Sequence, residues 1–149
     1  MSPSTGQPAT WIFQANPAQY DIEASLRTEH AELWNLRQHA SKVTMGDRVL
    51  IWISGKKSGI YAVGQVTSLP VEQLDSSTGK SYWKSTGGHQ VWPRVEVRYS
   101  RVLLDRPLFR RYLEFDAALS NLTILKQARG TNFSVTPAEW EALENWLTH

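Results

Sequence analysis

The sequence predicts one α+β domain, a small and partly antiparallel β-barrel that a C-terminal helix closes. A chain of 149 residues, 41% hydrophobic and 20% charged, suits one compact domain rather than two. Two β-branched runs, 48–53 and 60–67, flank a Gly/Ser/Lys segment that is typical of a hairpin loop. From Thr136 onward, a capping box and a Pro at the first helical position predict a helix. The α+β fold class is predicted from these three observations.

The first ordered element is expected to be a strand. Residues 1–9 are Ser, Pro, Gly and Thr-rich without periodicity, which predicts a flexible leader and an ordered chain from Thr10. The aromatic and β-branched run 11–15 predicts a strand. Asn16 and Pro17 end it, because proline biases the residue before it away from helix.

The following segment contains a short helix and a stretch with two interpretations. Asp21 is placed to cap a helix that begins at the next residue. Further on, Leu33, Leu36 and Ala40 have helix-like spacing. Trp34 lies off that stripe, so a loop or single turn that presents Trp34 elsewhere fits equally well.

The middle of the chain predicts a hairpin and a long loop. The run 48–53 is too short and too β-branched for a helix, and indicates a strand buried on both faces. Its partner, 60–67, contains Gly64, which suggests a bend of the kind that small barrels use. Residues 70–88 are polar and predict the long loop of the domain, a place where function is often found.

The last third predicts alternating short elements. Apolar and polar residues alternate over 91–99, as in a half-exposed strand, and Pro93 favours an edge position or a bulge. This alternation places Val91, Pro93, Val95, Val97 and Tyr99 on one face and Trp92, Arg94, Glu96 and Arg98 on the other, outward face. Residues 108–119 indicate a helix with a break near its end, and 122–125 a short strand. A loop is expected over 127–133, before the C-terminal helix.

Composition excludes several functional classes. The absence of cysteine excludes disulfides, thiolate metal sites and cysteine nucleophiles. No run approaches the roughly 20 apolar residues of a membrane helix, and the N-terminus lacks a signal peptide, so we expect a soluble, intracellular, cytoplasmic protein without a membrane partner. The net charge of +2 and the pI near 9.0 form a mild basic bias that does not establish a polyanionic partner.

No catalytic, metal or cofactor motif is readable. The sequence Gly79-Lys80-Ser81 resembles the end of a phosphate loop, but Leu74 stands where that loop needs glycine. The four histidines show no ligand spacing, so no metal site is expected. We therefore predict a protein that is not an enzyme and that carries no cofactor.

Short segments in a fixed order carry a resemblance to a known family. They are Trp11–Pro17, Tyr20–Ile22, Trp34 with Gln38, Gly46–Val49, Gly59–Gly64, Arg129–Phe133 and Thr136–Trp140. Together they resemble an EVE domain. The resemblance runs from about Thr10 to Leu147 and implies a PUA-like fold, a small mixed β-barrel with flanking helices, related to YTH and ASCH domains. A single EVE domain is thus expected over residues 10–149.

The resemblance also implies a function. EVE domains are implicated in recognising modified bases, notably modified cytosine in DNA, and the related YTH domains read methylated adenine in RNA. The expected partner is therefore a nucleic acid, DNA or RNA, that carries a modified base such as 5-methylcytosine, bound by a monomer. Because a paired base is hidden in the duplex, a reader must extract it and offset the cost by stacking, worth roughly 1–3 kcal/mol per base.

The resemblance suggests which residues meet the base. Trp34 matches the position of a cage tryptophan, and Asn16 and Gln14 match the strand end beside the pocket. Asn16 can instead form the turn before Pro17. For a second aromatic wall, Trp83 is favoured because it lies in a polar loop; the alternatives are Tyr61, Trp11 and Phe133. The expected base-binding set is Trp34, Asn16, Gln14, Trp83, Ser54 and Gln38.

A basic rim is expected to contact the nucleic-acid backbone, although exposed lysines are usually only solvated. Gly130 can let the backbone approach a ligand closely, and Arg129 stands where related sequences often carry Gln. The expected backbone-binding set is Lys56, Lys57, Lys80, Lys84, Arg129, Gly130, Thr131 and Asn132, to which Arg94 and Arg98 are further candidates.

Two rival functions remain open. An ASCH-like amidohydrolase acting on a modified nucleoside would need a Lys/Glu or similar pair in the pocket, which the sequence does not show. A small-molecule or free-nucleoside binding domain would need the pocket but no contact with phosphates.

Overall fold

A computed structural model describes residues 7–148. Most of the expected leader, residues 1–6, lies outside the described residues, and so does residue 149. The first strand begins at Thr10, as predicted, and ends at Ala15.

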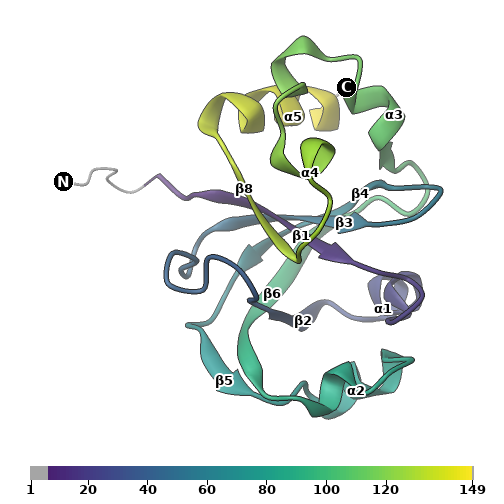
Figure 1. Ribbon diagram of the computed structural model, residues 1–149, viewed down its shortest axis with the longest axis vertical. Helices are drawn as coiled ribbons and strands as arrows, with labels where there is room; N and C mark the ends of the chain where they lie inside the picture. Colours follow the sequence, from purple (N-terminus) through teal and green to yellow (C-terminus); the bar gives the residue numbers. More distant parts are fainter. Residues whose placement is uncertain (1–6, 149) are drawn as a thin grey trace.

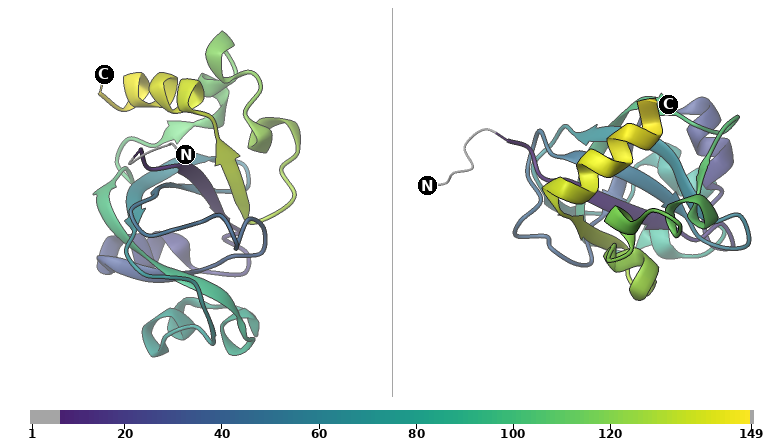
Figure 2. Two further views of the ribbon diagram at one scale, coloured as in Figure 1. Left: turned by 90° about the vertical axis from the view of Figure 1, so that its left-hand side faces the viewer. Right: turned by 90° about the horizontal axis from the view of Figure 1, so that it is seen from above.

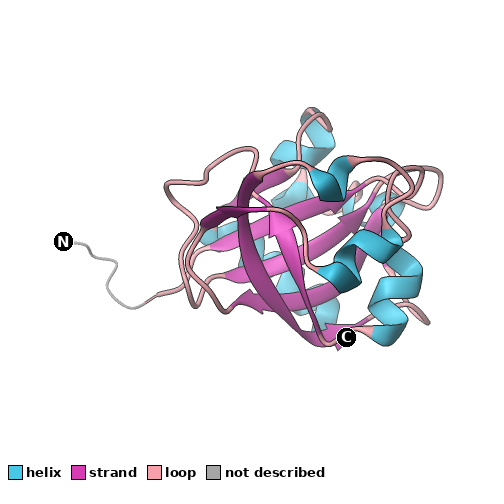
Figure 3. Cartoon of the chain, turned by 90° about the horizontal axis from the view of Figure 1, so that it is seen from below, coloured by secondary structure: helices cyan, strands magenta, loops and turns pink. Residues whose placement is uncertain are grey.

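Within the described residues, eight strands form one sheet that curls into a half-barrel (Figure 1; Figure 3). The order β2-β6-β4-β3-β1-β8 is completed by β5, which pairs with β6, and β7, which pairs with β4. Among the strand pairs of residues 7–148, only β1 and β3 run parallel, so the sheet is mixed. The strands are β1 (Thr10–Ala15), β2 (Ala31–Asn35), β3 (Arg48–Ile53), β4 (Gly59–Val66), β5 (Val71–Gln73), β6 (Trp92–Val102), β7 (Leu108–Phe109) and β8 (Asn132–Val135).

Helices cover both faces of the sheet. The helices are α1 (Ile22–Thr28), α2 (Ser77–Tyr82), α3 (Arg110–Leu113), α4 (Thr123–Lys126) and α5 (Pro137–Thr148), with 3₁₀ turns η1 (Gly87–His89) and η2 (Ala117–Leu119). Figure 2 shows α5 lying across the sheet on the side opposite α1 and α2. Each face carries its own apolar core, and β3 contributes to both: Leu50 and Trp52 face the α5 side, and Ile51 faces the other. The mixed sheet with flanking helices confirms the predicted α+β fold class.

The local signals for helix ends are confirmed. The Asp21 carboxylate accepts a hydrogen bond from the backbone of Ala24 at 3.4 Å. At the start of α5, Glu139 N–H donates to Thr136 Oγ1 at 3.1 Å and Thr136 N–H donates to Glu139 Oε1 at 3.0 Å, a complete capping box.

Both interpretations of the segment around Trp34 are wrong. Residues 31–35 form β2, whose partner is β6, with Trp34 opposite Val95. Burial alternates along β2, so Glu32 and Trp34 share the inner face. Pairing with a distant strand overrides the helix-like spacing of the leucines. Local periodicity carries no information about such a pairing.

Several other expectations are corrected. The expected loop 70–88 contains β5, α2 and η1, while 122–125 falls in α4 instead of a strand. The expected helix over 108–119 is split into β7, one turn of α3 and η2, and the expected loop 127–133 ends in β8. Strand β6 has neighbours on both sides where Pro93 lies, so that residue is not at a sheet edge. Gly64 does mark a register shift, as the sequence suggested.

Candidate nucleic-acid interface

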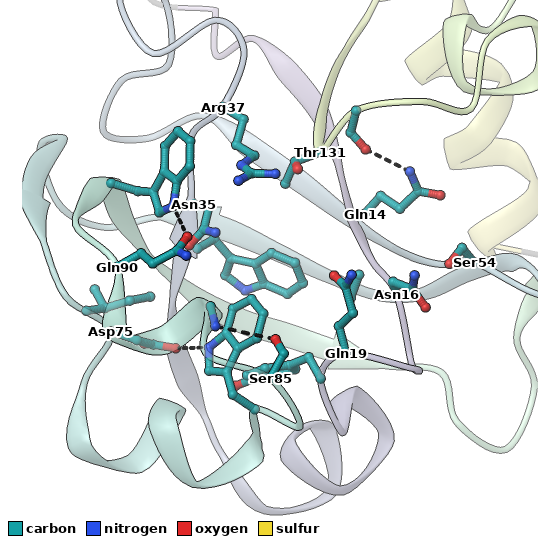
Figure 4. A pocket seen from close by; sticks show the side chains of 18 of the residues that line it. Gln14, Asn16, Gln19, Asn35, Arg37, Ser54, Asp75, Ser85, Gln90 and Thr131 are labelled. Atoms are coloured by element: carbon teal, nitrogen blue, oxygen red, sulfur yellow. Dashed lines mark hydrogen bonds between the residues drawn. The ribbon is translucent and has the colours of Figure 1, made fainter.

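A cavity of about 600 Å³ opens between the half-barrel and the 71–90 segment, which runs from β5 to the start of β6. This volume is typical of small-ligand sites. Figure 4 shows Gln14, Asn16 and Ser54 on one side of it and Asp75 and Gln90 on the other. The lining residues are Gln14, Ala15, Asn16, Gln19, Tyr20, Glu32, Leu33, Trp34, Asn35, Arg37, Gln38, Ser54, Asp75, Trp83, Ser85, Thr86, Gly87, Gln90, Trp92, Ala128, Gly130 and Thr131.

Trp34 is fixed at the inner end of this cavity. It is 8% exposed, and its ring centroid lies 6.1 Å from that of Phe13. The indole Nε1–H donates to Tyr99 Oη at 2.9 Å, and Tyr99 in turn donates to Glu32 Oε2 at 2.9 Å. The orientation of the indole is therefore set by a hydrogen-bond chain as well as by packing.

Glu32 is a buried carboxyl, and both of its oxygens accept hydrogen bonds. Besides Tyr99, it accepts hydrogen bonds from Tyr20 Oη and Ser25 Oγ, both at 2.9 Å. Burial raises the pKa of Glu32, which these three donors partly counteract. Burial also raises the pKa of Tyr20 and of Tyr99, and the neighbouring Glu32 charge adds to both shifts. The Glu32 carboxyl therefore orients the three hydroxyl groups that donate to it.

Asn16 is exposed at the end of β1. Its Oδ1 accepts a hydrogen bond from Ala18 N–H at 2.9 Å, so the turn that the sequence offered as an alternative is present. No hydrogen bond of Asn16 Nδ2 is found within the described residues. The side chain thus forms the turn and still presents a donor at the cavity.

Gln14 and Gln38 line the cavity, and their amide groups form hydrogen bonds with the backbone of the loop 128–132. Gln14 Nε2 donates to the carbonyls of Ala128 and Gly130 at 2.9 and 2.8 Å. Gln38 Oε1 accepts from the backbone of Thr131 at 2.8 Å and from the next residue at 2.9 Å. Gly130 has φ +119°, a conformation that favours glycine, so this residue lets the loop turn beside the cavity.

Asn132 has a structural position. It is 2% exposed and lies outside the cavity lining. Its Oδ1 accepts from the backbone of Arg37 at 2.7 Å and its Nδ2 donates to the Asn35 carbonyl at 2.9 Å. With both ends of the amide engaged, Asn132 anchors the chain after β2, and we do not retain it as a phosphate contact.

Trp83 stands on the opposite wall, in the 71–90 segment. Its Nε1–H donates to Asp75 Oδ2 at 2.7 Å, and its ring meets that of Tyr20 edge-on at 5.1 Å. Side chains at Gly87 and Gly88 would place Cβ atoms 2.3 and 2.6 Å from the indole. Only backbone without side chains can approach the ring this closely, so the two glycines seat Trp83.

Arg94 is fully buried beneath this segment, which corrects both the outward face expected for it and its candidacy for the basic rim. Its Nε donates to the Gln73 carbonyl at 2.9 Å, and its Nη2 donates to those of Gln90 at 2.9 Å and Gly87 at 3.2 Å. Its Nη1 donates to Asn35 Oδ1. Burial lowers the pKa of Arg94, and the Asp75 charge opposes that shift. One guanidinium thus fastens both ends of the segment to the half-barrel.

Sequence reasoning missed Arg37 and Trp92. Both line the cavity, and Arg37 Cζ lies 4.1 Å from the centroid of the Trp92 ring. Trp92 also donates to Gln90 Oε1 at 3.4 Å. The available signal was the alternation over 91–99, which placed Trp92 on the outward face of its strand, an unusual position for an indole. Figure 4 shows Arg37 at the mouth of the cavity, near Thr131.

The predicted basic residues are spread around the cavity and do not line it. Lys56 and Lys57 are exposed in the β3–β4 turn, just beyond Ser54, and Arg129 is exposed between two lining residues. Lys80 lies on α2, and Lys84 Nζ donates to the Pro17 carbonyl at 2.8 Å. Arg98 is exposed on β6.

Residues 7–148 contain neither the side-chain arrangement of a metal site nor a membrane-spanning helix. No group of His, Asp or Glu side chains there has the arrangement of a metal site. In the same part of the chain, no helix has the length and apolar character needed to cross a membrane.

The fold is shared with solved structures of low sequence identity. A hypothetical protein from Leishmania major matches at 19% identity and TM-score 0.70, covering 94% of each chain. Human THYN1, in complex with 5-methylcytosine-containing DNA, matches at 15% identity and TM-score 0.68, covering 93% of this chain and 96% of that one. A mutant of the ASCH protein of Zymomonas mobilis matches at 9% identity and TM-score 0.57, with coverages of 93% and 96%.

The sequence comparisons identify a family. No curated protein matches this chain by sequence. The model of the EVE domain matches residues 9–146, which is nearly the whole chain and agrees with the expected limits of the resemblance. The chain belongs to the EVE domain family.

Proposed function

We propose that this chain is a non-catalytic module that binds nucleic acid and holds one modified base, above all a modified cytosine in DNA, in the cavity. The observation that carries the proposal is the lining itself, in which indoles from separate elements converge with uncharged amides. Membership of the EVE family and the likeness to human THYN1, solved with 5-methylcytosine-containing DNA, support it.

Stacking supplies the first part of the binding energy. Trp34, Trp83 and Trp92 all border the same space. A base taken out of a duplex loses a few kcal/mol of stacking and pairing, and one aromatic contact returns about 1–3 kcal/mol. Trp34 is fixed by Tyr99 and Trp83 by Asp75, so two of the planes are oriented before a base arrives.

Amide side chains supply recognition of the base edge. The lining includes the amides of Asn16, Gln19, Asn35 and Gln90, each of which carries both donors and an acceptor. Nucleobase edges present the same neutral groups, and amides that another ligand covers without pairing them would penalise that ligand. Asn16 is the strongest candidate, because it lines the cavity and its Oδ1 holds the turn while its Nδ2 has no hydrogen-bond partner within the described residues. One chain supplies all these residues, so we propose that it binds as a monomer.

The lining favours binding over catalysis. An amidohydrolase of the ASCH type would need a base such as Lys/Glu converging on the substrate, and none of the described lining residues is a lysine. The lining carboxyl of Glu32 is engaged by three hydroxyl groups, and that of Asp75 by Trp83 and the backbone of Ser76. Neither is positioned as a free general base.

The test is a fluorescence anisotropy titration at fixed moderate salt. The probes are matched DNA and RNA oligonucleotides carrying cytosine, 5-methylcytosine, 5-hydroxymethylcytosine, adenine or N6-methyladenine. A preference for one modified base is expected, with modified cytosine in DNA first. Equal weak binding to all probes contradicts the proposal, and turnover of a free modified nucleoside would favour the enzymatic alternative. Tight binding of the free nucleoside, without gain from phosphates, would favour the small-molecule alternative.

Asn16 provides a sharp variant for the same titration. Asn16→Asp keeps an oxygen for the turn with Ala18 but loses the amide donor. It should lower the affinity for the preferred base by about 5- to 150-fold, since one good base contact is worth about 1–3 kcal/mol, and leave the melting temperature nearly unchanged. Ser134→Asp, an exposed change on β8, is the charge-matched control. An unaltered preference in Asn16→Asp would remove Asn16 from the base-binding set.

A further inference from the structure

An exposed group of aromatic and arginine side chains lies around α3, outside the cavity. We call Arg110, Arg111, Tyr112, Phe115 and Trp146 the α3 surface. Phe115 is 91% exposed, Tyr112 40% and Trp146 36%. Exposed large apolar side chains that cluster on a small domain commonly mark an interaction site.

The α3 surface is ordered. The rings of Tyr112 and Trp146 are stacked, with centroids 6.4 Å apart and planes at 10°. Arg111 Cζ lies 4.6 Å from the centroid of Phe109 and 5.0 Å from that of Tyr112. Within residues 7–148, Arg111 forms no salt bridge. Its guanidinium is thus held in place by two rings while its charge has no carboxylate partner.

The α3 surface is connected to the cavity through two loops. Arg110 N–H donates to the Ser58 carbonyl at 2.8 Å, and Arg110 Nη2 donates to the Leu125 carbonyl at 3.1 Å. The first contact is with the turn that begins at Ser54, and the second is with the helix that leads to Ala128; both Ser54 and Ala128 line the cavity. Figure 1 shows α3 above the β3–β4 turn and beside α4.

Positive charge is concentrated along this route. Residues 54–58, 109–116 and 126–131 contain six Lys or Arg and two carboxylates, so their net charge of +4 exceeds the +2 of the whole chain. Both carboxylates are occupied: Glu114 pairs with Arg110 at 3.0 Å, and Asp116 accepts from Trp146 Nε1 at 2.9 Å. On the other wall, by contrast, the Lys84 ammonium is bound to a backbone carbonyl.

We propose that the strand flanking the base in the cavity leaves over the β3–β4 turn and runs along the α3 surface. Lys56, Lys57 and Arg111 meet its phosphates, and Phe115 stacks on a neighbouring base. The proposal rests on the proposed function, because the cavity fixes where the strand begins. Phosphate contacts and an aromatic stacking platform are the features by which proteins hold single strands without reading sequence.

The experiment compares oligonucleotides with a mononucleotide of the same preferred base. Arg111→Glu should weaken oligonucleotide binding about five- to eightfold at 0.1 M salt and flatten the salt slope by about one phosphate, because each phosphate contact contributes a slope of about 0.7–0.9. Phe115→Ser should weaken it about fivefold or more by loss of stacking. Neither variant should change the affinity for the mononucleotide. Arg27→Glu and Leu69→Ser, at exposed positions on α1 and before β5, are the matched controls.

The outcomes separate this proposal from the proposed function. If a modified base is preferred but Arg111→Glu and Phe115→Ser bind oligonucleotides like the parent protein, the strand does not follow the α3 surface and the inference is overturned. If no base is preferred and both variants still weaken oligonucleotide binding while their controls do not, the α3 surface binds nucleic acid and the proposed function of the cavity is wrong. Equal losses for the mononucleotide would show damage to the cavity and overturn the inference as well.

Discussion

The wall of the cavity that contains Trp34 and the wall that contains Trp83 are held by different forces. Trp34 lies on β2 among buried apolar side chains and belongs to a core that includes Phe13 and Val95. Trp83 lies in the 71–90 segment, whose exposed and half-buried residues surround the buried Asp75, Gly79 and Gly88. Tyr82 and Trp83 pack against the same core, and hydrogen bonds from Arg94 and to Asp75 hold the rest of the segment.

This difference separates stability from recognition. Apolar burial is shared by the whole domain, so damage to the Trp34 wall lowers global stability. Hydrogen bonds hold most of the 71–90 segment, so it can open without unfolding the rest of the domain. The following predictions would break or sharpen that distinction.

The largest effect is expected from Trp34→Ala. Removing a nearly buried indole leaves a cavity against Phe13 and a Tyr99 hydroxyl without its donor. The free energy of unfolding should fall by about 3–5 kcal/mol, measured by urea denaturation. Trp34→Phe, which keeps a ring, should lose less. A stable Trp34→Ala protein would show that this wall does not depend on packing.

An intermediate effect is expected from Arg94→Met. The variant leaves the carbonyls of Gln73, Gly87 and Gln90 without their donor. The free energy of unfolding should fall by about 1–3 kcal/mol. Hydrogen exchange should rise in residues 71–90 while β1 and β3 stay protected.

Arg94→Lys tests whether charge alone suffices. Lysine lacks the planar guanidinium group and cannot reach all four acceptors that Arg94 binds. Hydrogen exchange should therefore rise in residues 71–90 of this variant too. If hydrogen exchange in both variants rises uniformly across the sheet, the 71–90 segment unfolds with the whole domain. The distinction between the two cavity walls is then wrong.

The smallest effect is expected from Glu32→Gln, as a change in pH dependence. Burial raises the pKa of Glu32 in the folded state, so the folded protein holds the proton more tightly than the unfolded chain. Stability from this group is present at low pH and is lost as the pH rises from the ordinary carboxyl range through the folded pKa. Denaturation midpoints of Glu32→Gln measured from pH 4 to 8 should therefore fall less with rising pH than those of the parent. A parallel profile would contradict this.

Local chemistry made part of the fold predictable. The capping box at Thr136 and Glu139 and the β-branched run of β3 act over a few residues, so the sequence predicted both elements correctly. The strand that carries Trp34 escaped prediction, because its evidence is the pairing with Val95, a residue 61 positions away. Helix-like spacing in a five-residue strand is a weak signal against such a partner.

The candidate site was predictable to a similar degree. Trp34, Asn16, Gln14, Trp83, Ser54 and Gln38 all line one cavity, and whether they bind a base stays a prediction. Arg94 was placed on an outward face, which is correct for the isolated strand; the 71–90 segment then folds over it. Periodicity indicates which side chains share a face and does not indicate what later covers that face. Arg37 and Trp92 were missed for the same reason.

The hydrogen bonds from Gln14 to the loop at 128–130 have a kinetic consequence. They join residues more than 110 positions apart, and β1 is flanked by β3 on one side and by β8 on the other. Contacts of such sequence separation close slowly, because the intervening chain must first lose its freedom. On a ribosome, β1 must wait for residue 130 before its end can be closed. The cavity is therefore assembled late, and a partly synthesised chain lacks the complete cavity.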